Sequence, residues 1–204
     1  MLSVQRFFRF ALWMMAVCVL LTAASGQAPD IDATTPEGAL LQRIGMAQSE
    51  DEKIRDMDEF LGKYPNHAGV PWVLAQQIAV FESRKDQPKV MGAAEKLLAL
   101  DPAAVRAGFA GLRAAESAGD GAKVIAFAEA THTACQKVLS AAMPEGADEE
   151  QWKASQDYAK QILPLSEYAL VTLAGKSSDA AAIDGYAERL TKLNEKSEYL
   201  PAIR

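Results

Sequence analysis

The sequence predicts an all-α protein: a right-handed α-solenoid of about four antiparallel helix pairs that follow an N-terminal signal peptide. Three observations lead to this prediction. Apolar residues recur at helical spacing after residue 36, and no stretch alternates with a period of two over the length of a strand. Two helix-like segments end alike, at Tyr64-Pro65 and at Asp101-Pro102. Segment pairs that recur about every 34 residues are typical of helical repeat arrays, in which neighbouring pairs cover each other's apolar faces.

The first 28 residues have the three parts of a secretory signal peptide. A basic head with Arg6 and Arg9 comes before an unbroken apolar run at 11–21, and small residues follow, with cleavage expected after Gly26 or Ala28. The run is shorter than the about 20 apolar residues that cross a bilayer, so we expect the chain to be periplasmic or secreted. An uncleaved membrane anchor is the alternative.

Composition and charge limit the class of partner. With 50% hydrophobic and 24% charged residues, the chain is expected to be globular rather than disordered. Removal of the signal takes two arginines and no acid, so the formal net charge falls from −6 to −8. Because an acidic chain repels phosphate backbones, nucleic acid is not an expected partner. Cys135 is then the one cysteine of the mature sequence, so no internal disulfide is expected.

Capping residues mark the first two helix pairs, which follow a flexible lead-in at 29–36. Ser49 and Glu52 have the spacing of a capping box, and Pro65 ends the helix that they begin. Asp86 can cap the second helix of the next pair. The expected pairs are 37–48 with 50–63, and 71–85 with 87–100.

The third pair is expected to join helices 103–118 and 121–142. Asp101 can cap the first of these helices, with Pro102 as its first residue, because proline is favoured in a first turn. Gly119-Asp120 then breaks the pattern and makes the turn between the two helices.

The last helix pair comes after a linker at 143–150, which is rich in Pro, Gly and acids. A long helical pattern covers 149–174, and Pro164 either kinks this helix or breaks it in two. The second helix is expected at 179–196, and the residues after it read as a tail. The C-terminal pair and tail therefore occupy 151–204.

The stretch 71–140 resembles the tetratricopeptide-repeat (TPR) family. "ALDP" at 99–102 is similar to the end of such a repeat, and "AESAGDGAKVIAFAEA" at 115–130 is similar to its middle. "FLGKYP" at 60–65 is a weaker match. The Trp-x-x-Leu-Gly-x-x-Tyr run of a first helix is intact nowhere, and Gly111-Leu112 reverses its Leu-Gly pair. The resemblance therefore implies a degenerate array.

The TPR resemblance implies that residues 37–142 bind a partner. In arrays of this kind, the first helices of each pair line a concave groove that holds a peptide or a partner protein. The residues that spacing places on the groove are Trp72, Gln76, Ala79 and Glu82 from one pair, and Arg106, Phe109, Arg113 and Glu116 from the next.

Arg106 and Arg113 lie two turns apart on one helical face, with Phe109 between them. Two guanidinium groups that flank an aromatic ring can hold a carboxylate or an acidic tail. The alternative is a solvated helix face, in which pairing with Glu116 stabilises the fold by about 0.5 kcal/mol or less.

Residues suited to catalysis or metal binding are sparse. His132 and Cys135 lie three apart on one helix, so they could form a thiol nucleophile with its base, or half of a zinc site. Zinc requires four ligands, and the surrounding sequence supplies no others. We therefore expect Cys135 to be a small core residue, and His132 to make a surface or inter-helix polar contact. The acidic runs at 49–59 and 147–150 suit helix first turns rather than calcium loops.

The sequence thus favours an exported, non-enzymatic scaffold that binds a protein or peptide in the envelope space of a bacterium, without cofactor or metal. One alternative is a structural or assembly component of an envelope complex, tethered by an uncleaved N-terminal helix. Another is an enzyme that uses Cys135 with His132.

Overall fold

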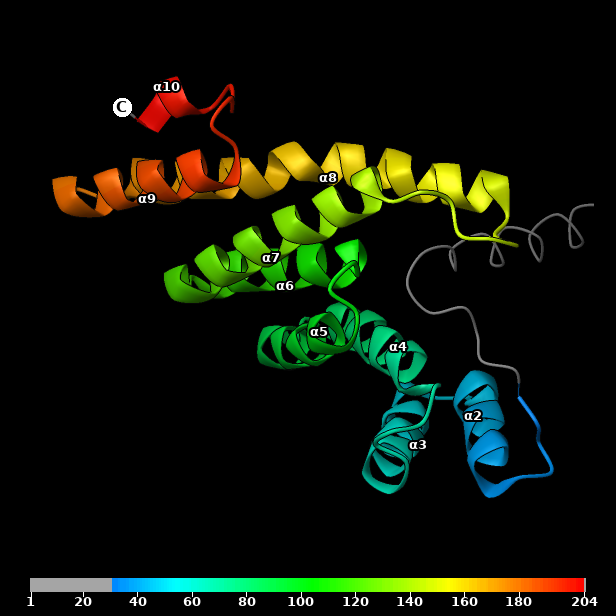
Figure 1. Ribbon diagram of the computed structural model, residues 1–204. Helices are drawn as coiled ribbons and strands as arrows, with labels where there is room; N and C mark the ends of the chain where they lie inside the picture. Colours follow the sequence, from blue (N-terminus) through cyan, green and yellow to red (C-terminus); the bar gives the residue numbers. More distant parts are fainter. Residues whose placement is uncertain (1–30, 204) are drawn as a thin grey trace, which may run out of the picture.

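The computed structural model describes residues 31–203, and all regular structure in that range is α-helical (Figure 1). The all-α class is therefore confirmed for this part of the chain. The predicted signal peptide at 1–28 lies outside it. No helix within 31–203 is long and apolar enough to cross a membrane. The helices are α2 (Pro36–Met46), α3 (Glu50–Lys63), α4 (Val70–Ser83), α5 (Gln87–Leu100), α6 (Val105–Ala118), α7 (Gly121–Ser140), α8 (Glu149–Lys176), α9 (Ala180–Leu193) and α10 (Leu200–Ile203).

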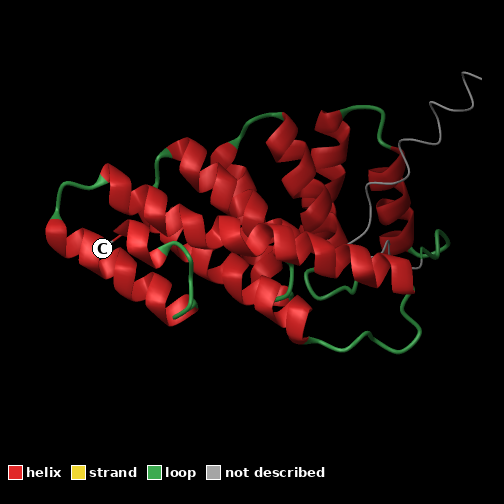
Figure 2. Cartoon of the chain, turned by 90° about the horizontal axis from the view of Figure 1, so that it is seen from above, coloured by secondary structure: helices red, strands yellow, loops and turns green. Residues whose placement is uncertain are grey.

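The helices pack in chain order. Each one contacts the helix that follows it, and further contacts join α4 with α6, α6 with α8, and α8 with α10. In Figure 1 the elements rise from α2 and α3 at the bottom to α8, α9 and α10 at the top. The view from above in Figure 2 shows the loops that connect successive helices. Apolar surface is therefore covered mainly by neighbours in the sequence.

One cluster of buried apolar side chains includes members of every helix from α2 to α10. The stripe predicted on α4 belongs to it, because Leu74, Ile78 and Phe81 are all buried. A smaller cluster, which includes Val105 and Cys135, joins α6, α7 and α8. The core therefore continues across the loop between α7 and α8, where the sequence predicts a linker.

Most predicted caps are confirmed. Ser49 Oγ accepts a hydrogen bond from the backbone N–H of Glu52 at 3.2 Å, and Asp86 Oδ1 accepts from that of Lys89 at 3.3 Å. Two further caps are present: Asp120 Oδ1 accepts from the N–H of Lys123, and Asp179 Oδ1 accepts from that of Ala181. Each cap satisfies a backbone N–H that has no partner within its helix, which fixes where the helix begins.

The cap predicted at Asp101 is wrong. The helix α6 begins at Val105, and Asp101 instead ends α5, with its N–H bonded to the carbonyl of Leu97 at 2.8 Å. The Asp101 side chain accepts from the N–H of Ala103, and its carbonyl accepts from that of Ala104. These bonds close a tight turn over Pro102, so the chain changes direction before the helix starts.

The Pro164 alternatives are resolved in favour of a single helix. α8 continues through Pro164 for 28 residues. Proline removes one backbone donor from the helix interior. Close to this position, Ser166 Oγ donates to the carbonyl oxygen of Leu163 at 2.6 Å.

The predicted C-terminal tail is part of the core. Leu200 and Ile203 of α10 are 7% and 6% exposed and join the main cluster. Ser197, in the turn before α10, is also buried. The helix α10 has only four residues, which is too short for apolar spacing to reveal a helix in the sequence.

The turns after α4 and α6 have the same hydrogen bonds. The N–H groups of Lys85 and Asp86 donate to the carbonyls of Glu82 and Phe81. The corresponding residues after α6 are Gly119 and Asp120, which donate to Glu116 and Ala115. This pattern requires a left-handed residue, and Lys85 (φ 55°) adopts that conformation without the freedom of the glycine at 119 (φ 70°).

The helices α6 and α7 approach closely at two glycines of α6. A Cβ on Gly111 would lie 2.2 Å from the Phe127 ring, and a Cβ on Gly108 would lie 2.7 Å from Thr131 Oγ1. Because real Cβ atoms do not come this close to other atoms, only glycine permits this packing.

The left-handed position predicts opposite effects of two substitutions. Lys85→Gly should stabilise the fold by about 1 kcal/mol, because glycine adopts this backbone without steric strain. Gly119→Ala should destabilise it by a similar amount. Urea unfolding of both variants and wild type measures the difference, and equal shifts in the same direction would contradict the prediction.

The close approach of α6 and α7 predicts that Gly111→Ala destabilises the fold by about 1–3 kcal/mol, because the methyl group overlaps the Phe127 ring. Gly62→Ala on α3 is the matched control. No atom lies within 4 Å of its Cβ position, so this change should stabilise the helix by about 0.5–1 kcal/mol. If Gly111→Ala leaves the thermal unfolding temperature unchanged, the contact between Gly111 and Phe127 relaxes freely and the prediction is contradicted.

Candidate binding face

The predicted groove residues lie on α4 and α6, and these two helices contact each other. Trp72, Gln76 and Phe109 are partly buried, and Ala79, Glu82, Arg106, Arg113 and Glu116 are exposed. Trp72 and Phe109 also pack against the buried core, Phe109 against both clusters. That they bind a partner remains a prediction.

The helix α8 adds an aromatic residue that the sequence analysis missed. The guanidinium carbon of Arg106 lies 4.6 Å from the centre of the Tyr158 ring, which is a cation–π distance. Burial raises the pKa of Tyr158, and the positive charges of Arg106 and Arg113 oppose that rise. The two residues are more than 50 positions apart in the sequence, so no local pattern could have revealed their contact.

Glu82 is the acidic residue at the end of α4. Burial raises the pKa of its carboxyl group, and the positive charge of Arg113 opposes the rise. Arg113 therefore interacts across the α4–α6 contact, whereas the sequence analysis considered only Glu116 on its own helix. That Glu82 and Arg113 line one groove remains a prediction.

A second polar contact joins α4 to α3. Lys53 Nζ, on α3, donates to Gln76 Oε1 at 2.7 Å. Burial lowers the pKa of Lys53, and the charge of Glu50 opposes this shift.

We call the surface made by Trp72, Gln76, Glu82, Arg106, Phe109, Arg113 and Tyr158 the α4–α6 face.

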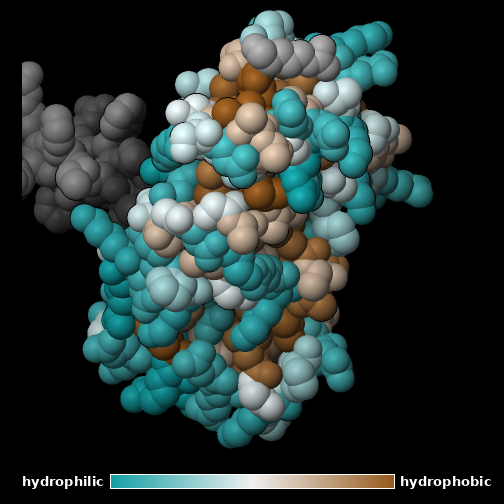
Figure 3. Space-filling view, turned by 90° about the vertical axis from the view of Figure 1, so that its left-hand side faces the viewer, coloured by the Kyte–Doolittle hydropathy of each residue, from teal (hydrophilic) through white to brown (hydrophobic). Residues whose placement is uncertain are grey.

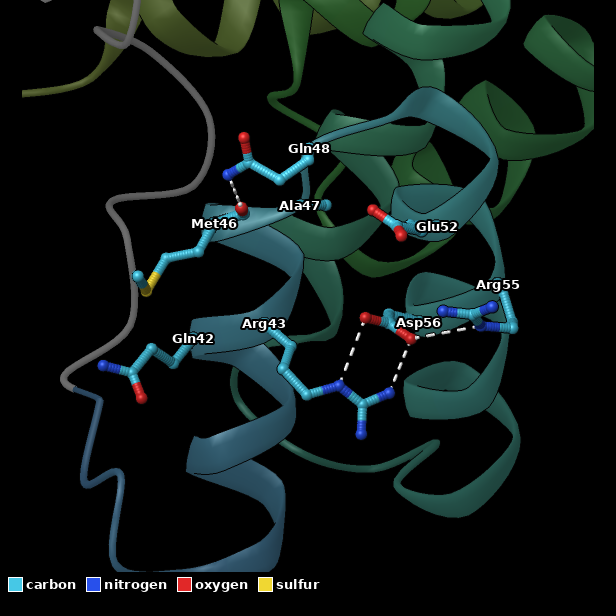
Figure 4. A pocket seen from close by; sticks show the side chains of 8 residues that line it. All are labelled: Gln42, Arg43, Met46, Ala47, Gln48, Glu52, Arg55 and Asp56. Carbon is cyan, nitrogen blue, oxygen red and sulfur yellow. Dashed lines mark hydrogen bonds and ion pairs between the residues drawn. The ribbon is translucent and has the colours of Figure 1, made fainter.

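A pocket of about 300 Å³ lies between α2 and α3 (Figure 4). Three of its charged groups, Arg43, Arg55 and Asp56, pair with one another. Arg43 donates through Nε and Nη2 to the two carboxylate oxygens of the buried Asp56, and Arg55 lies 3.6 Å from the same carboxylate. The hydrogen bond from Arg43 lowers the pKa of Asp56. The pocket is therefore a charge-compensated contact between two helices, and Met46 at its edge is exposed.

Of the two alternatives for His132, the inter-helix contact is confirmed, and the surface position is wrong because the side chain is buried. Its Nε2 atom lies 3.3 Å from Oε1 of Glu167 on α8, and both side chains are about 95% buried. Glu167 accepts hydrogen bonds from Asn194 Nδ2 at 3.0 Å and from Ser197 Oγ at 2.6 Å. This buried cluster joins α7 and α8 to the turn before α10. Glu167 could not be recognised from the sequence, because a single acid within an otherwise ordinary helix has no distinctive spacing.

The predicted core position of Cys135 is also confirmed. Its side chain is buried, and burial raises the pKa of the thiol to about 12. The thiol is thus protonated at neutral pH, whereas a nucleophilic cysteine acts as a thiolate. The environment of Cys135 opposes the reactivity that the enzyme alternative requires.

Comparison with known proteins gives no relatives. No protein-family model matches the chain, and neither a curated protein nor a solved structure matches it. Residues 31–203 contain no group of three or more His, Cys, Asp or Glu side chains placed to hold a metal ion. Function must therefore be argued from the geometry of the chain itself.

The burial of Cys135 predicts slow alkylation. In a Cys18→Ser background, iodoacetamide at pH 8 should modify native Cys135 at least about 100-fold more slowly than the urea-unfolded chain, because few thiolates form and access is blocked. Mass spectrometry follows the reaction. Comparable rates in the two states would contradict a core thiol.

Proposed function

We propose that this chain is an exported, non-enzymatic TPR-like scaffold that binds a protein or peptide partner in the cell envelope of a bacterium. The α4–α6 face is the main support. Arg106 and Arg113 of α6 are exposed, partly buried aromatic residues lie on α4, α6 and α8, and Arg106 packs on Tyr158 at 4.6 Å. Arg, Trp and Tyr are the residue types that contribute most to protein–protein binding.

For the helices we propose a right-handed solenoid of antiparallel pairs. The contacts of each helix with the next, and of α4 with α6 and α6 with α8, are those expected of stacked pairs. The left-handed turns at Lys85-Asp86 and Gly119-Asp120 support the same repeat, because they are 34 residues apart. In such an array the α4–α6 face lies on the concave side.

The chemistry of this face favours an acidic segment of the partner. Arg106 and Arg113 are separated by about 10.5 Å along the axis of α6, so each can pair with a different carboxylate. Phe109 lies between them and offers an apolar contact. Tyr158 restricts Arg106 before the partner arrives, which lowers the entropy lost on binding.

A tethered assembly component is the second candidate function, and the basic head and apolar run at 1–21 favour it. N-terminal sequencing of the native protein separates the two. A start near Gln27 or Pro29 supports release into the envelope space, whereas retention of Met1 supports a tether.

The proposed function predicts a partner that depends on the α4–α6 face. Pull-down from the native envelope with wild type should recover a protein that Arg106→Ala/Arg113→Ala recovers poorly. With that protein purified, the double variant should bind at least about tenfold more weakly, because two charge-assisted contacts are lost.

The control variant is Lys96→Ala/Lys137→Ala, which removes two exposed positive charges from α5 and α7. It should bind like wild type. Equal binding by all three proteins would exclude the α4–α6 face as the binding site. Catalytic turnover that survives purification and is lost on changing one polar residue would overturn the non-enzymatic assignment.

A further inference from the structure

Two glutamates, Glu82 and Glu116, occupy equivalent positions near the ends of α4 and α6. The carbonyl of Glu82 accepts a hydrogen bond from the N–H of Lys85 at 3.0 Å, and that of Glu116 accepts from the N–H of Gly119 at 3.2 Å. Both glutamate side chains are exposed, and α4 contacts α6. In the proposed solenoid these two helices run parallel, so the two carboxylates lie at the same end of the α4–α6 face.

Arg113 lies near both glutamates but pairs directly with neither. Its positive charge opposes the rise that burial causes in the pKa of Glu82, and it precedes Glu116 by one turn of α6. Within 31–203, no ion pair involves Glu82, Arg113 or Glu116. Elsewhere, charged groups of α7 pair directly with Glu95 of α5 and with Arg189 of α9. Among the three residues at this end of the face, two acids thus outnumber one base.

The carboxyl group of Glu82 is accessible but partly desolvated. Its side chain is exposed, yet burial raises the pKa of the group. The attraction between opposite charges is stronger where protein replaces part of the surrounding water. A positive charge that a partner brings to Glu82 is therefore held more strongly than it would be at a fully hydrated carboxylate.

The other end of α6 is positive. Arg106 lies about 15 Å from Glu116 along the helix axis, and its guanidinium packs on the Tyr158 ring at 4.6 Å. Phe109 lies between the two ends. Figure 3 looks onto the end of the molecule where α6 is followed by α7, and shows mainly hydrophilic surface around smaller apolar areas. Contacts at this end therefore depend mainly on charge, and the sign of that charge changes along α6.

The spacing of these charges sets their order in a partner segment. Arg106 and Arg113 are about 10.5 Å apart along α6, which matches about three residues of an extended chain. Glu116 lies about 4.5 Å beyond Arg113, which corresponds to about one or two further residues. A segment with acids alone leaves Glu82 and Glu116 without a counter-charge and is repelled by them.

We propose that the α4–α6 face binds an extended segment of its partner in which a basic residue follows two acids, and that this base lies between Glu82 and Glu116. The two acids pair with Arg106 and Arg113, and an apolar residue between them packs on Phe109. The base balances the two glutamates, so segments that lack it are rejected. This inference rests on the proposed function and adds the order of charges in the partner.

The probe is a fluorescein-labelled peptide in which two aspartates are about three residues apart, a leucine lies between them, and a lysine follows the second aspartate by about two residues. One comparison peptide has the same composition with the lysine between the aspartates, and another has glutamine in place of the lysine. Fluorescence anisotropy at low salt should show saturable binding of the first peptide, at least about fivefold tighter than that of either comparison peptide.

The variant Glu82→Gln/Glu116→Gln keeps the size of both side chains and removes their charge. It should bind the lysine peptide at least about fivefold more weakly than wild type does, and it should lose the preference for lysine over glutamine. The matched control is Glu188→Gln/Glu195→Gln, which removes two exposed acids from α9 and from the turn after it. It should bind all three peptides like wild type.

A third variant, Arg106→Ala/Arg113→Ala, separates this inference from the proposed function. If it loses the lysine peptide while Glu82→Gln/Glu116→Gln binds that peptide like wild type, the order of charges is wrong and the acid-binding face stands. Absence of saturable binding, or equal weakening by both glutamine double variants, also overturns the inference. The pull-down from the native envelope still decides the proposed function in those cases.

Discussion

The structure depends on the burial of one apolar stripe per helix against the next helix in the chain. An isolated amphipathic helix of about 14 residues is marginal in water, so each of these helices requires a neighbour. Every helix from α2 to α10 contributes to one buried cluster, and contacts follow chain order. Because contacts within 31–203 join mainly successive helices, each layer there depends on the layers beside it.

This arrangement explains the division between core and surface on the first helices. On α6, Gly108 and Gly111 face α7 and allow the two helices to come close together. Arg106 and Arg113, on another side of the same helix, stay at the surface and interact with Tyr158 and Glu82. A single helix thus supports tight packing and a polar surface, because its faces meet different neighbours. Only the polar surface is available to a partner.

The buried polar cluster has a different role at the end of the array. Glu167 is held by Asn194 and Ser197 and lies beside His132, so the segment before α10 is fixed to α7 and α8. A buried carboxylate is costly unless it is hydrogen-bonded, and removal of one partner leaves it unsatisfied. The cluster therefore specifies where the C-terminal segment docks. Together with Leu200 and Ile203, it holds α10 against α8 and α9.

The sequence by itself determined the helical class, most caps and the buried stripes, because these depend on spacing and on side chains within a few residues. Ser49, Asp86 and the stripe of Leu74 on α4 are examples. The sequence also placed Cys135 in the core. The start of α6, the packed C-terminal segment, the contact of Tyr158 with Arg106 and the partners of Glu167 were decided only by tertiary structure. Each involves residues whose meeting depends on how successive helices stack, and that geometry is set by the packing of whole helix faces rather than by any local pattern.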